Sequence, residues 1–137
     1  GSGEAAMLAD HFERGGDGPR AAVHLAHAAR QAMDGNDLKE ALGLAERGLA
    51  LGPAPTTRGR LLLSEAQARL WLGHDARLHE AAVEAVGLLS GRERYAAYEV
   101  IYSVIGDTVT NDPELERLGH QLLAETPGPA DRDAWLA

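Results

Sequence analysis

Few residues of this chain have the types and spacing of a catalytic site. The sequence contains no cysteine, which excludes a disulfide framework, a cysteine-ligated zinc ion and a thiol nucleophile. It also lacks the phosphate-binding, dinucleotide-binding, zinc-protease and serine-hydrolase motifs. Lys39 is the only lysine, and we expect it at an ordinary helix start rather than in a Schiff-base or phosphate site. The sequence therefore predicts a non-catalytic chain that carries no cofactor and no metal.

Two histidines come closest to the spacing of a metal site. His24 and His27 lie three residues apart, so on a helix both could face one ion. Asp34 is the only acidic residue of the predicted helix, and it lies too far along to share that ion. His74 and His79 are five residues apart and would fall on different faces. We favour the alternative for the first pair, two histidines at the polar edge of an alanine-rich helix.

Two further clusters could contact a ligand. Tyr95, Tyr98 and Tyr102 recur at helical spacing, which indicates either an aromatic wall for a ligand or core packing, and we favour the core. Four arginines at the starts of two predicted helices could bind a carboxylate or phosphate, or could be solvated surface: Arg58, Arg60, Arg92 and Arg94. Trp71 ends its predicted helix, and we expect it to pack against the turn that follows.

The composition indicates which elements must position these residues. Alanine (25) and leucine (20) make up a third of the 137 residues, whereas valine, isoleucine and threonine together number 13. Alanine and leucine favour helices, so a β-sandwich, a barrel and a doubly wound sheet are disfavoured. The length is typical of one domain. Arginine outnumbers lysine 12 to 1, which suggests GC-rich coding and a bacterial source.

The net charge narrows the range of partners. At −8, it argues against a nucleic-acid or anionic-membrane surface. No apolar run reaches the roughly 18 residues of a membrane span, so we expect a cytoplasmic chain. Residues 107–137 hold seven acids and two arginines, an acidic end that could dock a basic partner or form the solvated face of a terminal cap. Oligomeric state is left open.

Glycine, proline, asparagine and aspartate punctuate the chain between helix-length segments. Asp37 and Glu40 resemble a capping box, and Pro19 suits a first helical position. The spacing predicts seven helices and a short eighth, over 4–14, 20–34, 37–51, 56–72, 75–89, 93–106, 113–125 and a few residues after 129.

These predicted helices repeat with a period of 37 residues. Pro53, Ser90 and Pro127 close equivalent helices, and a small residue recurs at the position of Ala45, Ala82 and Gly119. The repeat therefore predicts three helix pairs, 20–51, 56–89 and 93–125, within a single domain over 4–137. We interpret residues 1–3 as an expression scar, and the chain as a piece of a longer protein.

The segment 36–53 resembles the second helix of a tetratricopeptide repeat. It has small residues at Ala41 and Gly48 and a closing proline at Pro53. It departs from that family in its period, about 34 residues in the consensus, and in lacking most of the aromatic positions of the first helix. Residues 8–90 also resemble a stretch of large bacterial regulators. In those proteins a serine/threonine kinase or AAA-type ATPase domain is followed by tetratricopeptide-like repeats.

The resemblance implies an all-α solenoid of antiparallel helix pairs with a concave groove lined by the first helix of each pair. We expect a scaffold that binds an amphipathic protein or peptide segment bearing a carboxylate. In the repeat register the groove residues are Arg30, Met33, Arg60, Leu63, Gln67, Leu70, Val100 and Val104. The alternative is a small-molecule sensor that controls an attached kinase, ATPase or DNA-binding domain. Its site would be built from Tyr95, Tyr98, Tyr102, Arg92 and Arg94.

Overall fold

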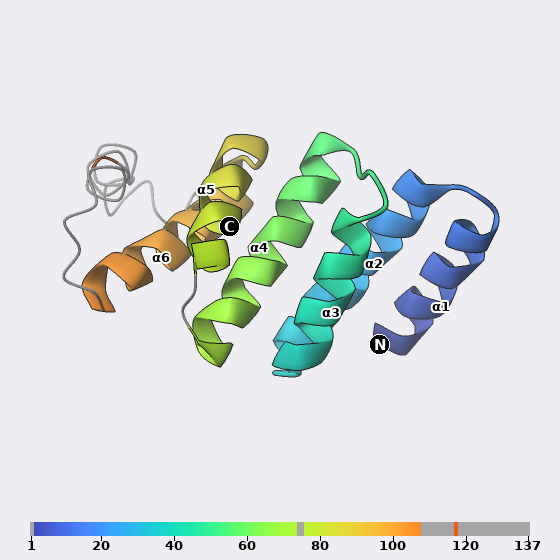
Figure 1. The fold of residues 1–137 in the computed structure, drawn as a ribbon, viewed down its shortest axis with the longest axis horizontal. Coiled ribbons are helices and arrows are strands. Elements are labelled where there is room, and N and C mark those ends of the chain that lie inside the picture. Colours follow the sequence, from blue (N-terminus) through green and yellow to red (C-terminus); the bar gives the residue numbers. More distant parts are fainter. Residues whose placement is uncertain (1, 74–75, 108–116, 118–137) are drawn as a thin grey trace.

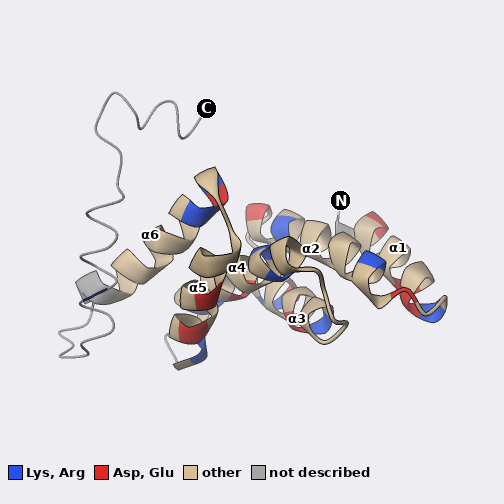
Figure 2. Ribbon diagram, turned by 90° about the horizontal axis from the view of Figure 1, so that it is seen from above, with Lys and Arg blue, Asp and Glu red and all other residues tan. Residues whose placement is uncertain are grey.

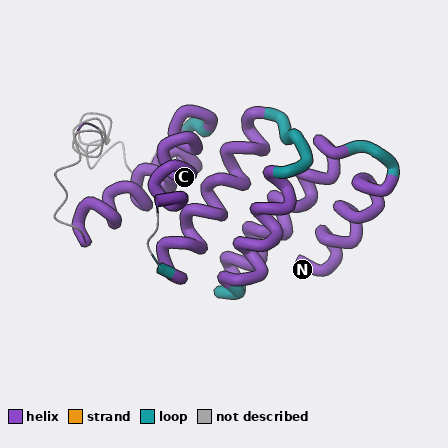
Figure 3. The backbone as a smooth tube through the Cα atoms, viewed as in Figure 1, coloured by secondary structure: helices purple, strands orange, loops and turns teal. Residues whose placement is uncertain are grey.

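The structure, a computed structural model, describes residues 2–73, 76–107 and 117. All regular secondary structure in these ranges is helical (Figure 3). The elements are α1 Ser2–Arg14, α2 Gly18–Asp34, α3 Leu38–Leu49, α4 Pro55–Leu72, α5 Ala76–Leu88 and α6 Gly91–Asp107. The all-α prediction is confirmed, and the predicted bounds of these six helices differ from the observed ones by at most two residues. Apart from residue 117, the predicted helix 113–125 lies outside the described residues, and so does the short C-terminal helix.

Local chemistry accounts for where two of the helices begin. The Asp17 side chain accepts a hydrogen bond from the backbone N–H of Arg20 at 3.2 Å, which caps α2. Asp37 caps α3 in the same way, by accepting from the backbone N–H of Glu40 at 3.3 Å. Between α2 and α3, Asn36 adopts a left-handed backbone conformation (φ 59°), which asparagine tolerates better than most residues.

Each helix packs against the next one along the chain, and α2, α4 and α6 also contact one another in sequence (Figure 1). Seen from above, α3 and α5 lie on the opposite side of α4 from α2 and α6 (Figure 2). Helix α4 is thus the central element, because it contacts α2, α3, α5 and α6. This arrangement brings the first helices of the predicted pairs side by side.

Most of the buried apolar residues in the described part of the chain are alanines. The bulkier core side chains gather in two places. One cluster, around Leu62, Leu78 and Ile101, joins α4, α5 and α6, and another, around Leu25 and Leu61, joins α2 to α4. Small side chains fill little space, so the helices must approach closely to exclude water and voids.

Gly48 on α3 shows how close this approach is. A Cβ atom added to Gly48 would lie 2.7 Å from the Leu61 Cδ2 atom and 3.3 Å from the Leu25 Cβ atom. Leu61 and Leu25 are both fully buried, so neither side chain has free space to move into. The absent side chain at Gly48 therefore permits the contact of α3 with α2 and α4.

We predict that Gly48→Ala and Gly43→Ala have opposite effects on stability, although both glycines lie on α3. An added methyl group at Gly48 overpacks the core and should lower the free energy of unfolding by about 1–2 kcal/mol. A methyl group at Gly43 meets no atom within 4 Å, so the higher helix propensity of alanine should raise that free energy by about 1 kcal/mol. Urea denaturation of both variants measures the difference. Stabilisation by both substitutions would show that α3 does not pack on Leu61 as described.

Candidate binding groove

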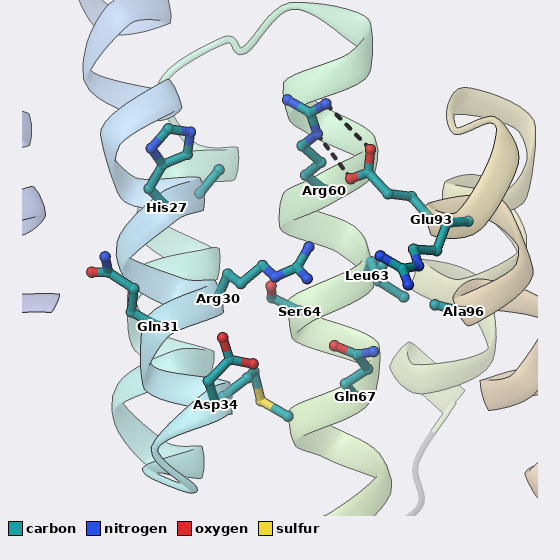
Figure 4. A pocket seen from close by; sticks show the side chains of 13 residues that line it. His27, Arg30, Gln31, Asp34, Arg60, Leu63, Ser64, Gln67, Glu93 and Ala96 are labelled. Atoms are coloured by element: carbon teal, nitrogen blue, oxygen red, sulfur yellow. Dashed lines mark hydrogen bonds and ion pairs between the residues drawn. The ribbon is translucent and has the colours of Figure 1, made fainter. Parts of the chain in front are cut away.

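A groove with a volume of about 550 Å³ lies between α2, α4 and the start of α6 (Figure 4). Its lining combines an apolar floor with polar and charged side chains. The lining residues are Ala26, His27, Arg30, Gln31, Met33, Asp34, Arg60, Leu63, Ser64, Gln67, Arg92, Glu93 and Ala96. We call this surface the groove.

Five of the eight residues that the repeat register assigned to a concave surface line this groove: Arg30, Met33, Arg60, Leu63 and Gln67. They come from α2 and α4, whose helical spacing places one face of each helix toward the other. The remaining three are elsewhere. Leu70 and Val104 are half-buried against the α4–α5–α6 core. Val100 is only 4% exposed, so its assignment to an open surface is wrong. Helix α6 packs against both α4 and α5, which buries that position.

The register did not assign several polar residues that line the groove. His27, Gln31 and Asp34 flank Arg30 on α2, and Ser64 and Glu93 face them from α4 and α6. The missed signal is the width of a helical face: His27 and Asp34 lie three and four positions from Arg30 and share its side of the helix, and Gln31 lies four positions after His27. A single stripe of positions was too narrow to describe the surface.

The three tyrosines do not form one wall. Tyr98 is buried in the core, Tyr95 is half-buried and Tyr102 is exposed. Arg94 donates a hydrogen bond from Nη2 to the Tyr98 hydroxyl at 3.3 Å, and its guanidinium lies over the Tyr98 ring. Tyr98 thus follows the core alternative, and these residues do not close together around a ligand.

The predicted patch of four arginines is divided among separate contacts. Arg60 donates from Nε and Nη2 to the Glu93 carboxylate, at 2.9 and 3.2 Å, which joins α4 to α6 beside the groove (Figure 4). Arg58 is paired with Glu84 of α5, and this hydrogen-bonded contact lowers the pKa of the Glu84 carboxyl from its ordinary value. Arg92 lines the groove.

A second ionic cluster centres on Glu65 of α4, whose side chain is only 2% exposed. Arg77 of α5 donates to both Glu65 carboxylate oxygens, at 2.8 and 3.1 Å. This hydrogen bonding raises the pKa of the Arg77 guanidinium. Arg69 contacts Glu65 at 3.3 Å and also reaches Glu46 of α3 at 3.3 Å. Glu65 therefore links α4 to α5 directly, and Arg69 extends the cluster to α3.

Ionic contacts also join α1 to α3, where Arg47 donates to Glu13 at 2.6 Å and is paired with Asp10. Helix α2 also carries charged side chains, but two of them make no such contact with any described residue. Within the described part of the chain, Arg30 and Asp34 of α2 have neither an ion pair nor a side-chain hydrogen bond. Both line the groove, and Figure 4 shows the Arg30 side chain reaching across it toward Ser64. Arg30 and Asp34 are thus charged groove residues that form no ionic contact within the described part of the chain.

The groove is slightly cationic in a strongly acidic chain. Its three arginines outnumber its two carboxylates, which gives a formal charge of +1 against −8 for the whole sequence. Elsewhere, charges of both signs are interspersed along the helices (Figure 2). An anionic group is therefore the best electrostatic match to the groove.

His24 has a structural contact. Its ring stacks on Phe12 of α1, with centroids 5.2 Å apart and planes 2° apart, and Arg20 lies over the same Phe12 ring. His27 lines the groove. Among the residues that the structure describes, no three histidines, aspartates or glutamates are grouped so as to hold a metal ion.

Trp71 does not pack against the turn, and that prediction is wrong: its side chain is 73% exposed. The position of Trp71 relative to α2 is consistent with this exposure. In Figure 4, Asp34, the last residue of α2, lies level with Gln67 of α4. Trp71 lies one helical turn beyond Gln67, so on this face it has no residue of α2 beside it.

Comparison with known proteins provides no family for this chain. No family model matches it, and no curated protein or solved structure is significantly similar to it. None of the helices that the structure describes is long and apolar enough to cross a membrane.

We predict that Glu65→Ala lowers the free energy of unfolding by about 2 kcal/mol. The substitution leaves Arg77 and Arg69 without their shared carboxylate, although the partial exposure of both arginines reduces the cost of a lost buried partner. Glu80→Ala is the control, because the exposed Glu80 carboxylate lies 3.6 Å from the same Arg77. It should change stability by less than about 0.5 kcal/mol. Equal losses in thermal or chemical denaturation would contradict a central role for Glu65.

Proposed function

We propose that this chain is a non-catalytic protein-interaction module whose groove binds an amphipathic peptide segment bearing a carboxylate. We further propose that it is a tetratricopeptide-like solenoid from a larger bacterial signalling protein. The 37-residue repeat, the small residues at its equivalent positions and the sequential contacts of α2, α4 and α6 support the solenoid. The resemblance of residues 8–90 to bacterial regulators supports the signalling context.

The observation that carries the binding proposal is the Arg30 side chain. Its guanidinium has no carboxylate partner among the described residues, and it lies in the groove with Met33 and Leu63. An arginine can donate two parallel hydrogen bonds to a carboxylate, and the apolar residues nearby suit an aliphatic or aromatic side chain. Asp34, Gln31 and Gln67 offer polar contacts at the same surface.

Arg60 is a weaker candidate than Arg30 for the same role. Arg60 already donates two hydrogen bonds to the Glu93 carboxylate, and a ligand carboxylate would need these same donors. A ligand would have to displace Glu93 from Arg60. In the proposed complex, Arg30 is therefore the anchor, and the Arg60–Glu93 pair borders the site.

A small-molecule effector is the second candidate ligand. The groove volume of about 550 Å³ falls within the range of ligand pockets, about 300–1,000 Å³. The groove residues Arg30 and Arg92 would then bind an anionic group of the effector. The predicted tyrosine wall does not contribute to this alternative, because Tyr98 is in the core.

We predict that Arg30→Gln weakens peptide binding about tenfold or more, because a charge-assisted hydrogen bond contributes roughly 1.5–3 kcal/mol. The probe is a set of peptides selected on the unmodified chain from a displayed random library, with peptides about 12 residues long to match roughly 18 Å of helix. Fluorescence anisotropy measures their affinity. Arg14→Gln is the matched control, since it removes an exposed arginine of α1 that does not line the groove.

Glu93→Gln provides a test of opposite sign. Removing this carboxylate frees Arg60 for the ligand, so affinity for an acidic peptide should rise. Equal binding by the Arg30→Gln chain and the unmodified chain would reject the groove as the peptide site. If no peptide can be selected but an anionic metabolite raises the melting temperature, the effector alternative replaces the proposal.

A further inference from the structure

Trp71 continues the groove-lining face of α4. Arg60, Ser64 and Gln67 line the groove, and Trp71 follows them at the spacing i, i+4, i+7, i+11 of one helical face. Trp71 itself lies outside the groove lining, one turn further along. Its side chain is 73% exposed, and the adjacent Leu72 is also exposed.

The surface around Trp71 is suited to contact with another molecule. Tryptophan is enriched among the residues that dominate binding energy at protein interfaces, because it combines a large apolar area with few rotatable bonds. Helix α2 ends at Asp34, level with Gln67, so it provides no wall beside Trp71. A ligand that follows the groove along α4 would meet this indole next.

The charge of Arg30 and the apolar surface of Trp71 therefore lie at two different levels along α4. The Arg30 guanidinium, which has no ion pair among the described residues, reaches toward Ser64 (Figure 4), and Trp71 lies seven positions after Ser64. Seven residues of α-helix span about 10.5 Å, which is two turns. A helical ligand lying along α4 would match this order with one acidic side chain and one large apolar side chain about seven residues apart.

We propose that the occupant of the groove is an amphipathic helix of a partner protein, which places an acidic residue on Arg30 and, two turns away, a large apolar residue on Trp71. This inference rests on the proposed function and names the chemistry of its partner. Two observations carry it. The positive charge of Arg30 in the groove complements an acidic side chain, and the exposed Trp71 lies on the groove-lining face of α4. An extended peptide would need a shorter separation, about three residues, to cover the same distance.

The test uses the selected peptides described above. We expect their consensus to contain an acidic and a large apolar residue about seven positions apart. Trp71→Ala should weaken their binding at least tenfold, and Met7→Ala should not. Met7 is the matched control, because its side chain is also 73% exposed and lies on α1, outside the groove.

A second measurement keeps the tryptophan intact. In a Trp135→Phe background, Trp71 is the only tryptophan, so its emission reports directly on its surroundings. We expect a blue shift on saturation with peptide, as the indole leaves water, and no such shift with a peptide whose large apolar residue is replaced by alanine. This readout does not depend on how well the Trp71→Ala chain folds.

The outcomes separate this inference from the function on which it rests. If Arg30→Gln weakens binding while Trp71→Ala and the Trp71 emission show no effect, the extension to Trp71 is overturned and the groove function stands. A consensus separation of three residues overturns the helical occupant. If Arg30→Gln and Trp71→Ala are both without effect, the proposed function fails together with the inference.

Discussion

Close helix packing on alanine and glycine is the constraint on which the rest of this structure depends. Most buried apolar residues among those that the structure describes are alanines, and Gly48 brings α3 against Leu61 and Leu25. A buried alanine removes less apolar area from water than a leucine does, so each contact contributes little by itself. The fold therefore relies on many contacts at short range. The relative placement of α2 and α4, and hence the groove, depends on this close approach.

Ionic contacts complement this small-residue packing. Glu65 is almost fully buried, and its two hydrogen bonds with Arg77 fix the position of α5 relative to α4. Replacing a whole buried ion pair by well-packed apolar residues is often neutral, whereas removing one partner is costly because it leaves the other charge unpaired. The ionic contacts also distinguish the arginines: Arg47, Arg58, Arg60 and Arg77 join helices, whereas Arg30 lines the groove and forms no ion pair with any described residue.

Sequence patterns predicted the helices well because turn residues and caps act locally. Asp17 and Asp37 bond to backbone groups three residues away, so their roles can be read without knowing the rest of the fold. The repeat register also placed Arg30 and Arg60 on facing helices, as the structure has them. Val100 and Trp71 were misplaced for a tertiary reason. The burial of Val100 depends on the contacts of α6 with both α4 and α5. The exposure of Trp71 depends on where neighbouring elements end relative to α4. The pairing of Arg60 with Glu93, 33 residues apart, has no local signal either.

The position of α4 has a consequence for how the chain folds. Helices that pack mainly on their sequence neighbours give a low contact order, which is typical of domains that fold in microseconds to milliseconds. Helix α4 contacts four of the other five described helices, whereas α1 packs mainly against α2. Opening of α1 would therefore break mainly its contacts with α2, whereas opening of α4 would break the contacts with four helices at once. Amide hydrogens of α4 should then exchange with solvent only through global unfolding, and those of α1 through local opening of the array.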